Sequence, residues 1–308
     1  MHNHNHSHDH GHHHHHHASP ADMASGAFIT GIALNMIYVI TEAIFGFADH
    51  SMALLSDAGH NLGDVASLLL SLIAFRLAKV KPSSTFTYGY KKTTILASLT
   101  NAVILLLAVG MLGYESIQRL SHPAPVPGGV IAWVAALGIV VNGFTAYLFH
   151  RKGSELNMRG AYLHMLADAV VSVVVVISGI IIQYTHLYWI DPVISIVVLL
   201  VILYSTWSLL TDSLRLSMDA VPPDMDVDKI TGVISNMNNV QNIHHVHIWA
   251  MSTTENALTA HVVLNDDLNF DEKMKLVHDI KHELEHHNIG HATIELESAT
   301  APCHGEDC

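Results

Sequence analysis

A run of apolar residues, AYLHMLADAVVSVVVVISGIIIQ at residues 161–183, decides how this sequence folds. The run is long enough to cross a bilayer as a helix, because a span needs about 20 apolar residues. Two of its polar side chains, His164 and Asp168, are four residues apart and therefore lie on one helix face. Ionisable groups are costly inside a bilayer and commonly mark a pathway for ions or protons. The run predicts a membrane helix with a functional pair on one face.

A second apolar run, which contains SMALLSDAGHNLGD at residues 51–64, repeats the H-x-x-x-D pattern with His60 and Asp64. If the two helices pack with these faces together, two imidazoles and two carboxylates converge into a tetrahedral site suited to zinc. The alternative is that each pair is only a helix-packing hydrogen bond. Two copies in separate spans make that alternative the weaker one, since two independent burial costs would have to coincide. Asp57, three residues before His60, is expected to orient it.

The four proposed ligands also predict what the site does. Four protein ligands saturate zinc and leave no position for an activated water, which favours holding the ion over hydrolysis. A protonated imidazole cannot bind a metal, so zinc and protons compete for the site. A mid-membrane site whose occupant alternates in this way is what an exchanger needs. We therefore expect a zinc/proton antiporter with zinc as its cargo.

The composition supports a membrane protein. The chain has 308 residues, of which 50% are hydrophobic and 13% charged, and a mean hydropathy of +0.33. Soluble domains carry roughly 25% charged residues, so a disordered chain is excluded and a cytosolic enzyme is disfavoured. Six apolar stretches are expected to span the bilayer, at about 26–47, 52–75, 93–117, 129–149, 160–183 and 190–210. Lys and Arg gather in the second and fourth connections, which predicts that these connections and both termini are cytoplasmic.

The two ends of the chain differ from the spans. The first 17 residues hold 11 of the 27 histidines and are expected to be disordered; His12 to His17 belong to a native tail or to an expression tag. Residues 222–308 hold 4 Lys/Arg and 15 Asp/Glu, which argues against nucleic acid as a partner. The predicted parts are a tail (1–24), a transmembrane domain (25–213), a cytoplasmic domain (214–298) and a flexible end (299–308).

After Pro222 the composition of the sequence changes to that of a small soluble domain. Helices are expected over 224–237 and 270–288, and strands over 243–251, 257–265 and 291–296. This αββαβ order predicts a two-layer α+β domain. The second helix repeats apolar residues at helical spacing, and these are expected to face the core: Phe270, Met274, Val277, Ile280 and Leu284.

This domain is rich in potential zinc ligands. The run His244-His245-Val246-His247 opens a strand, so His245 is expected to point away from its two neighbours. The other candidates lie on the next strand, the second helix and the last strand: His261, His278, Glu295 and Glu297. Such a surface can bind one or two zinc ions. The alternative is a set of ordinary polar strand faces.

Two further patterns are weaker. The sequence His282-Glu283-x-x-His286 matches the metalloprotease motif, but the helical spacing places both histidines toward solvent, so a protease is a remote alternative. Cys303, His304 and Cys308 near the end are possible soft metal ligands. A membrane-bound zinc sensor or storage protein is the main alternative to a transporter.

Several segments together resemble the cation diffusion facilitators, and the resemblance covers about residues 24–308. They are SMALLSDAGHNLGD (51–64), FTYGYKKTTILASLTNA (86–102), AYLHMLADAV (161–170), HHVHIWAM (244–251) and HATIELE (291–297). The ending PCHGEDC (302–308) is similar to that of bacterial zinc-efflux members of the cobalt–zinc–cadmium resistance type.

The resemblance implies a homodimer in the bacterial cytoplasmic membrane that exports zinc in exchange for protons. It implies six transmembrane helices, and dimerisation through a cytoplasmic domain of ferredoxin-like, metallochaperone-like fold. His60, where other members have Asp, is associated in the family with a preference for zinc. The family's regulatory zinc site would correspond to His244, His261, His278, Glu295 and Glu297.

Overall fold

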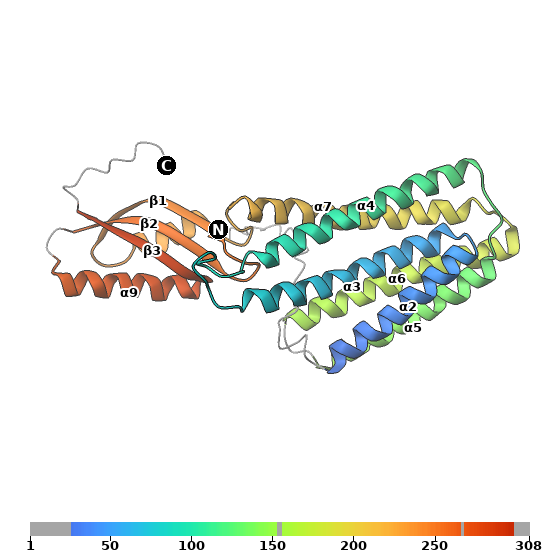
Figure 1. The fold of residues 1–308 in the computed structure, drawn as a ribbon, viewed down its shortest axis with the longest axis horizontal. Helices are drawn as coiled ribbons and strands as arrows, with labels where there is room; N and C mark the ends of the chain where they lie inside the picture. The colour runs from blue at the N-terminus through green and yellow to red at the C-terminus, as the bar shows by residue number, and fades with distance from the viewer. Residues whose placement is uncertain (1–25, 153–155, 266–267, 299–308) are drawn as a thin grey trace, which may run out of the picture. The chain divides into compact units, whose positions relative to one another are not determined.

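The structure is a computed structural model that describes residues 26–152, 156–265 and 268–298. Its first part consists of six long helices (Figure 1). They are α2 (Gly26–Ala48), α3 (Met52–Ala78), α4 (Thr93–Ser121), α5 (Gly128–Lys152), α6 (Leu156–Thr185) and α7 (Ile190–Ser217). Each covers one of the six stretches predicted from hydropathy, and several extend beyond it at their cytoplasm-predicted ends. The expected six-helix transmembrane architecture is confirmed.

Among the described residues, five of these helices are long and apolar enough to cross a membrane by length and composition alone. Helix α3 carries three ionisable residues, Asp57, His60 and Asp64, within a largely apolar sequence. Large apolar side chains are widely exposed on the other helices; Trp133 of α5, for example, is 80% exposed. A large exposed apolar surface would promote aggregation in water, but it is the surface that a helix presents to lipid.

The chain forms two compact units. The first combines the residues up to Val65 with Ala108–Ile202, and the second combines Ala66–Leu107 with the chain from Leu203 onward. Helices α3, α4 and α7 therefore contribute one part to each unit. The soluble domain belongs to the second unit.

In the first unit, glycines allow very close helix contacts. A Cβ atom on Gly179 of α6 would lie 2.6 Å from the Ala132 nitrogen and 2.7 Å from the Gly128 oxygen of α5, so the backbones of the two helices touch. A Cβ atom on Gly138 of α5 would overlap the ring of Tyr38 from α2. Helices α2, α5 and α6 are therefore held in one packing arrangement.

The apolar core of the first unit joins several helices. Ala53 and Leu54 of α3 pack with residues of α5 and α6, and Leu199 of α7 packs in a second cluster against Leu112 of α4. These contacts place the polar faces of α3 and α6 inside the unit.

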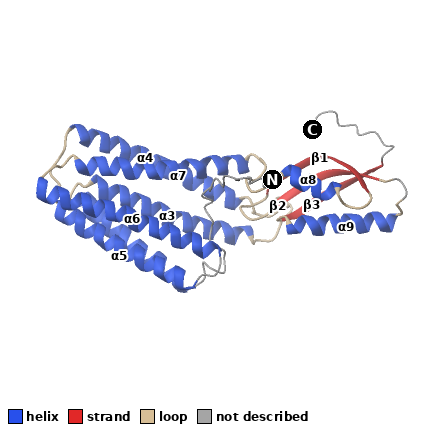
Figure 2. Cartoon of the chain, turned by 180° about the vertical axis from the view of Figure 1, so that it is seen from behind, coloured by secondary structure: helices blue, strands red, loops and turns tan. Residues whose placement is uncertain are grey.

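The second unit contains the α+β domain, with α8 (Val227–Ser235), β1 (Val240–Ala250), β2 (Asn256–Leu264), α9 (Phe270–His286) and β3 (Ile289–Ser298). The predicted αββαβ order is confirmed. The sheet order is β1-β2-β3, with β1 and β2 antiparallel and β2 and β3 parallel (Figure 2). Helices α8 and α9 contribute Ile234 and Ile280 to a core shared with Leu258 and Val262 of β2. Because side chains alternate along a strand, His261 lies on the opposite face of the sheet.

The predicted core face of α9 is partly wrong. Phe270 is 73% exposed and Met274 is 45% exposed, whereas Leu276, Ile280 and Leu284 are buried. The buried residues follow each other at intervals of four and form one face against the sheet. Phe270 is the first residue of the helix, directly after the Asn269 cap, and Met274 lies off that face.

Candidate functional site

Three of the four predicted membrane ligands come together in the first unit. The Nε2 atom of His60 lies 3.2 Å from an Oδ1 atom of Asp168 and 3.8 Å from an Oδ2 atom of Asp64. One ligand atom from each residue lies within 4.8 Å of the others. The side chains are only 16%, 24% and 3% exposed for His60, Asp64 and Asp168, so α3 and α6 shield the group from solvent.

The fourth predicted ligand, His164, belongs to α6 and lies one turn before Asp168. Residues at this spacing share a helix face, which is the face of α6 that meets α3 at Asp168. The side chain of His164 lies outside the described residues. The ligand set of four therefore stays a prediction.

Asp57 lies three residues before His60 on α3 and is 1% exposed. Among the described residues, neither oxygen of its carboxyl group has a hydrogen-bond partner. Asn61 donates to the Asp57 backbone oxygen at 3.1 Å and to Glu42 at 3.3 Å. The expected role of Asp57 in orienting His60 stays a prediction. The hydrogen bond from Asn61 to Glu42 of α2 was not predicted, because the sequence shows which face of α3 Asn61 occupies but not which helix meets that face.

The start of α3 is fixed by a residue far away in the sequence. Asp191, at the start of α7, accepts hydrogen bonds from the Ser51 hydroxyl at 2.5 Å, the Met52 nitrogen at 2.6 Å and the Ala53 nitrogen at 3.3 Å. The first backbone N–H groups of a helix have no partner within the helix, and a carboxylate there also suits the helix dipole. Asp191 therefore holds the helix that carries His60 and Asp64. The sequence signal was an acidic residue just inside the sixth span.

Three buried serines connect the same helices further along. Ser195 of α7 bonds through its hydroxyl to Ser56 of α3 at 2.5 Å and to Ser116 of α4 at 2.7 Å. All three side chains are fully buried. These bonds satisfy polar groups that would otherwise be costly in the membrane, and they fix α3 against α4 and α7.

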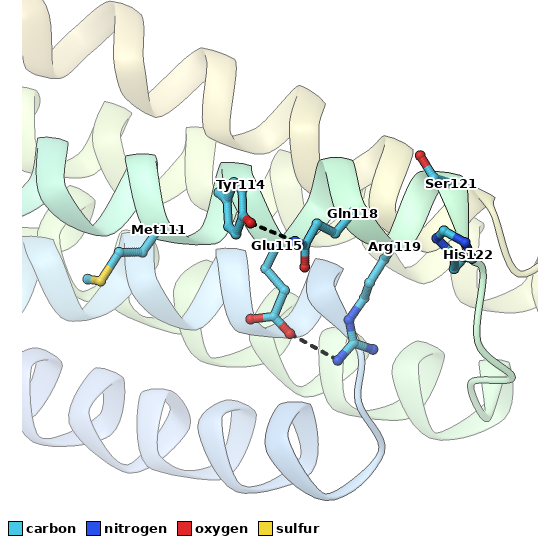
Figure 3. Close-up of a pocket in the computed structure, with 7 residues that line it drawn as sticks. All are labelled: Met111, Tyr114, Glu115, Gln118, Arg119, Ser121 and His122. Carbon is cyan, nitrogen blue, oxygen red and sulfur yellow. Dashed lines mark hydrogen bonds and ion pairs between the residues drawn. The ribbon is translucent and has the colours of Figure 1, made fainter.

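A surface pocket lies on α4 of the same unit (Figure 3). Glu115 and Arg119 form an ion pair of 3.1 Å at its wall, and Arg119 also donates to the His50 backbone oxygen at 2.6 Å. Because the two charged groups neutralise each other, this pocket is a weaker candidate for cation binding than the cluster on α3 and α6.

A second cluster lies on the face of the sheet away from α8 and α9. His244 of β1 is paired in register with His261 of β2, which is paired with Glu295 of β3. Glu297 contacts both imidazoles, at 3.2 Å from His244 Nε2 and 2.7 Å from His261 Nδ1. Glu295 lies 3.4 Å from His261 Nε2. His244, His261 and Glu297 bring three ligand atoms within 4.8 Å of one another.

The expectation that His245 points away from its neighbours is wrong. The ring of His245 lies 5.0 Å from the rings of both His244 and His261. The strand register is irregular between His244 and His247, and His245 has a positive φ of 50°. This β-bulge rotates the strand, so the simple alternation of side chains fails there. His247 is exposed after the bulge.

The remaining candidates lie apart from this cluster or outside the described residues. His278 is exposed on α9, and the sheet separates α9 from the face that carries His261. His282 and His286 are both exposed on the same helix, as predicted, with their rings 4.9 Å apart. Cys303, His304 and Cys308, like the N-terminal histidines, lie outside the described residues.

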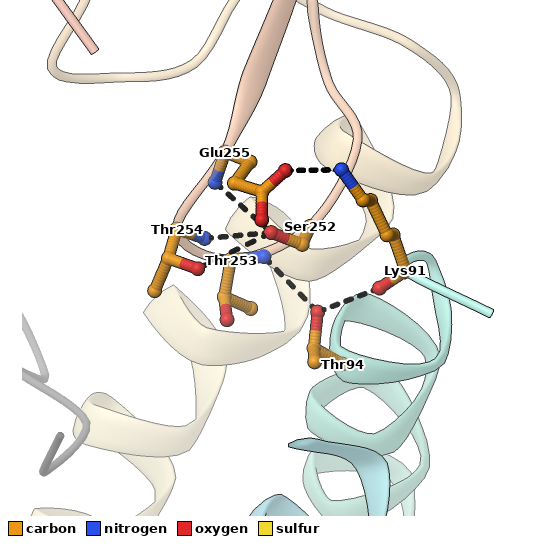
Figure 4. A network of polar contacts seen from close by, with 6 residues as sticks. All are labelled: Lys91, Thr94, Ser252, Thr253, Thr254 and Glu255. Atoms are coloured by element: carbon orange, nitrogen blue, oxygen red, sulfur yellow. Dashed lines mark hydrogen bonds and ion pairs between the residues drawn. The ribbon is translucent and has the colours of Figure 1, made fainter. Parts of the chain in front are cut away.

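The turn between β1 and β2 contacts the start of α4 within the second unit (Figure 4). Lys91 forms an ion pair with Glu255, and the Thr253 nitrogen donates to the Thr94 hydroxyl at 3.0 Å. Lys92 pairs with Asp219 at 2.5 Å. The basic segment before α4, predicted from its lysines to be cytoplasmic, thus contacts the α+β domain.

Comparison with known proteins identifies the family. A family model described as the cation efflux transmembrane domain matches residues 28–216, and one described as the cytoplasmic domain of cation efflux proteins matches residues 222–299. Over 264 residues the chain is 40% identical to the cadmium, cobalt and zinc/H(+)-K(+) antiporter of Bacillus subtilis, with 85% of each protein covered. Over 293 residues it is 34% identical to the zinc transporter ZitB of Escherichia coli, covering 94% of this chain and 92% of ZitB.

A third relative is the metal cation efflux system protein CzcD of Cupriavidus metallidurans, 34% identical over 278 residues that cover 90% of this chain and 87% of CzcD. A solved structure of the metal-bound C-terminal domain of the CzcD transporter is 30% identical to this chain, of which it covers 24%, with 99% of that domain aligned and a TM-score of 0.22. The long matches to relatives and the two family models together settle the class. The chain belongs to the cation diffusion facilitator family of cation efflux proteins, and it is a membrane transporter of metal cations rather than an enzyme.

Proposed function

We propose that this chain exports zinc from the cytoplasm in exchange for protons, with His60, Asp64, His164 and Asp168 as its cargo site. The observation that carries the proposal is the convergence of three of these side chains between α3 and α6. The names of the relatives, a zinc transporter and a zinc/H(+)-K(+) antiporter, support both the cargo and the coupling.

The spacing of the three side chains suits zinc. Ligands bound tetrahedrally at about 2.1 Å from zinc lie about 3.4 Å from each other. The distances from His60 Nε2 to the two carboxylates are 3.2 Å and 3.8 Å, which bracket that value. The two carboxylates would balance the charge of a divalent ion, and an imidazole from His164 would complete four ligands.

Proton exchange follows from the same groups. When zinc leaves, two carboxylates and two imidazoles remain in a site shielded from water, and protons reduce the cost of their charge. Protonated groups no longer bind zinc, so loading with protons resets the site. If the site opens to one side of the membrane at a time, zinc leaves in one direction and protons enter in the other.

The cluster on the sheet supports a second role for zinc in the same protein. His244, His261 and Glu297 form a half-buried group in the α+β domain, with His245 and Glu295 beside it. We propose that zinc bound there regulates transport. We further propose that the protein is a homodimer in the bacterial cytoplasmic membrane with both termini in the cytoplasm.

The transport proposal is tested by zinc uptake into proteoliposomes that contain the purified protein. With an imposed pH gradient, the wild-type protein is expected to accumulate zinc, and His60→Ala is expected to fall to the level of empty liposomes. His122→Ala, which removes an exposed histidine outside the site, serves as the matched control and should transport normally.

The possible results separate the alternatives. Zinc flux that does not respond to the pH gradient would contradict proton coupling. Zinc binding without flux in the wild-type protein would instead favour the sensor or storage protein. Equal flux in His60→Ala and the wild type would contradict the assigned cargo site.

A further inference from the structure

Helix α9 carries a pair of histidines that belongs to neither of the two clusters described above. His282 and His286 are four residues apart, and both are exposed. Their ring centres lie 4.9 Å apart, with an angle of 81° between the ring planes. Residues at this spacing share one face of a helix, so both imidazoles project from the same side of α9. The proposed transport mechanism uses neither of them.

The spacing of the two rings suits a shared metal ion. Two imidazoles bound to one zinc ion at about 2.1 Å, with tetrahedral angles, have ring centres about 5 Å apart. The separation of 4.9 Å between the rings of His282 and His286 matches that value. Two histidines one turn apart on a helix are also the metal-binding part of the H-E-x-x-H motif. The two side chains therefore already lie close to the arrangement that zinc requires.

The rest of α9 holds the pair in place. Ile280 and Leu284 are fully buried in the core of the domain, and Leu284 lies between the two histidines in the sequence. At the start of the helix, Asn269 and Glu272 form a capping box that satisfies backbone N–H groups. Because the helix is fixed at its apolar face and at its N-terminus, binding of an ion has to order only two side chains.

The charges around the pair favour a cation. Asp279 and Glu285 are each three residues from His282, and Glu283 is three residues before His286. Side chains three or four residues apart are neighbours on a helix surface. Within α9, no lysine or arginine occupies such a position relative to either histidine. The local field is therefore negative, which raises the local concentration of divalent cations.

The pair is separate from the cluster on the sheet and has no third ligand beside it. Helix α9 covers one face of the sheet, and His261 lies on the other. In the part of the chain that the structure describes, the groups of three or more potential ligands are those on α3 and α6 and on the sheet, and neither includes a residue of α9. A zinc ion on α9 would keep coordination positions for water, whereas a metalloprotease site binds zinc through three protein ligands.

We infer that His282 and His286 form an exposed site for a divalent transition-metal ion of the zinc type on the surface of α9. The two imidazoles hold the ion, and water or a ligand from outside the protein fills the remaining positions. Because these positions are open, the ion exchanges readily, which suits a site that takes up and passes on zinc better than one that stores it. The inference goes beyond the proposed function and does not depend on the cargo site.

The test measures how zinc protects each histidine from chemical modification. Diethyl pyrocarbonate reacts with exposed imidazoles, and a bound metal ion blocks the reaction. The full-length protein in detergent is treated at free zinc concentrations set by a metal buffer, and mass spectrometry reads the modification at each residue. This readout separates the pair from the 11 histidines among the first 17 residues, which also bind zinc in solution. His282 and His286 are expected to be protected at the same free zinc concentration.

Single substitutions show whether the two histidines act together. His286→Ala is expected to raise the free zinc needed for half-protection of His282 by at least about tenfold, because the ion loses its second, intramolecular ligand. His282→Ala should have the same effect on His286. Both substitutions replace exposed residues, and circular dichroism checks that the variants are folded.

Two controls locate the effect. His287→Ala removes the neighbouring imidazole, which lies 3.8 Å from Glu283. His261→Ala disrupts the cluster on the sheet. Both variants should show the same protection of His282 and His286 as the wild type.

Each outcome supports or contradicts the inference. Absence of protection in the wild type would overturn it, and so would unchanged protection of His282 in folded His286→Ala. Loss of protection in His261→Ala would also overturn it, since the effect would then come from zinc bound on the sheet. Absence of zinc flux in proteoliposomes, with the pair still protected, would instead contradict only the proposed function.

Discussion

His60 and Asp168 are within hydrogen-bonding distance of each other although 108 residues separate them in the sequence. The imidazole of His60 therefore lies close to two carboxyl groups, those of Asp64 and Asp168. A protonated His60 is stabilised by the carboxylates of Asp64 and Asp168, and a neutral His60 can bind zinc together with them. The same three side chains therefore stabilise either occupant, which is the property an exchange site requires.

The cluster on the sheet is held together by Glu297, because this carboxylate contacts both His244 and His261. We expect Glu297→Gln to weaken zinc binding at the cluster by at least about 10- to 100-fold, because that is the loss seen when a group that only orients a metal ligand is removed, and Glu297 is itself a proposed ligand. Binding is measured by zinc titration of the full-length protein in a His60→Ala background, in which the cargo site is silenced.

His247→Ala is the matched control, because it removes an exposed histidine from the same strand. Its zinc affinity should equal that of the His60→Ala background. Equal affinities in Glu297→Gln and His247→Ala would contradict a metal site at this cluster.

At the scale of single residues, the sequence predicted the position of a side chain where helical spacing alone determines which face the residue occupies. The i, i+4 spacing within a regular helix placed His60 and Asp64 on one face, and His60 of α3 meets Asp168 of α6 as expected. The position of His245 was mispredicted because a β-bulge interrupts the alternation of side chains. The hydrogen bond from Asn61 to Glu42 was not predictable from spacing, since it depends on how two helices are rotated against each other.

At the scale of elements, the orientation of α3 depends on its capped N-terminus. We expect Asp191→Ala to lower the free energy of unfolding by about 1–3 kcal/mol, because the Met52 and Ala53 N–H groups and the Ser51 hydroxyl would lose a buried acceptor. Thermal unfolding in detergent measures the loss. Zinc binding at the cargo site should weaken in parallel.

Asp191→Asn is the control for this change. It keeps one acceptor oxygen at the cap, so its stability should lie between those of the wild type and Asp191→Ala. A melting temperature of Asp191→Ala equal to that of the wild type would show that the cap does not hold α3.

Elements with a long, uniform pattern were the most predictable. Hydropathy located all six long helices, including α3 with its three ionisable residues. The core face of α9 was harder to predict. Phe270 and Met274 are apolar and fit the helical period, but Phe270 is the first residue of the helix and Met274 lies off the face that packs against the sheet. Sequence periodicity shows which residues share a face and does not show where the neighbouring element ends.

At the scale of the whole molecule, the distribution of Lys and Arg predicts that the segment around Ser84 is cytoplasmic and the segment around Ala124 is external. Single cysteines at these two exposed positions, in a background with Cys303→Ser and Cys308→Ser, test the prediction. A membrane-impermeant maleimide added to intact cells should label Ala124→Cys and leave Ser84→Cys unlabelled until the cells are lysed. Labelling of Ser84→Cys in intact cells would reverse the proposed direction of export.

The predicted limits of the domains, with a boundary near residue 213, stay a prediction. Helix α7 continues to Ser217, and the two compact units divide α3, α4 and α7 along their length. Hydropathy shows where the chain enters and leaves the membrane. It does not show which parts of long helices contact each other, so the two compact units could not be predicted from the sequence.

The glycine contact between α5 and α6 has a consequence for the depth of the cargo site. Because a side chain at Gly179 would collide with the α5 backbone, sliding α6 by one residue would bring the bulkier Ser178 or Ile180 to the crossing point. The crossing therefore fixes how α5 and α6 are aligned along their length. Asp168 is eleven residues before Gly179 on the same helix, about 16 Å along its axis. The position of Asp168 along the bundle is therefore set, relative to α5, by a glycine near the C-terminal end of α6.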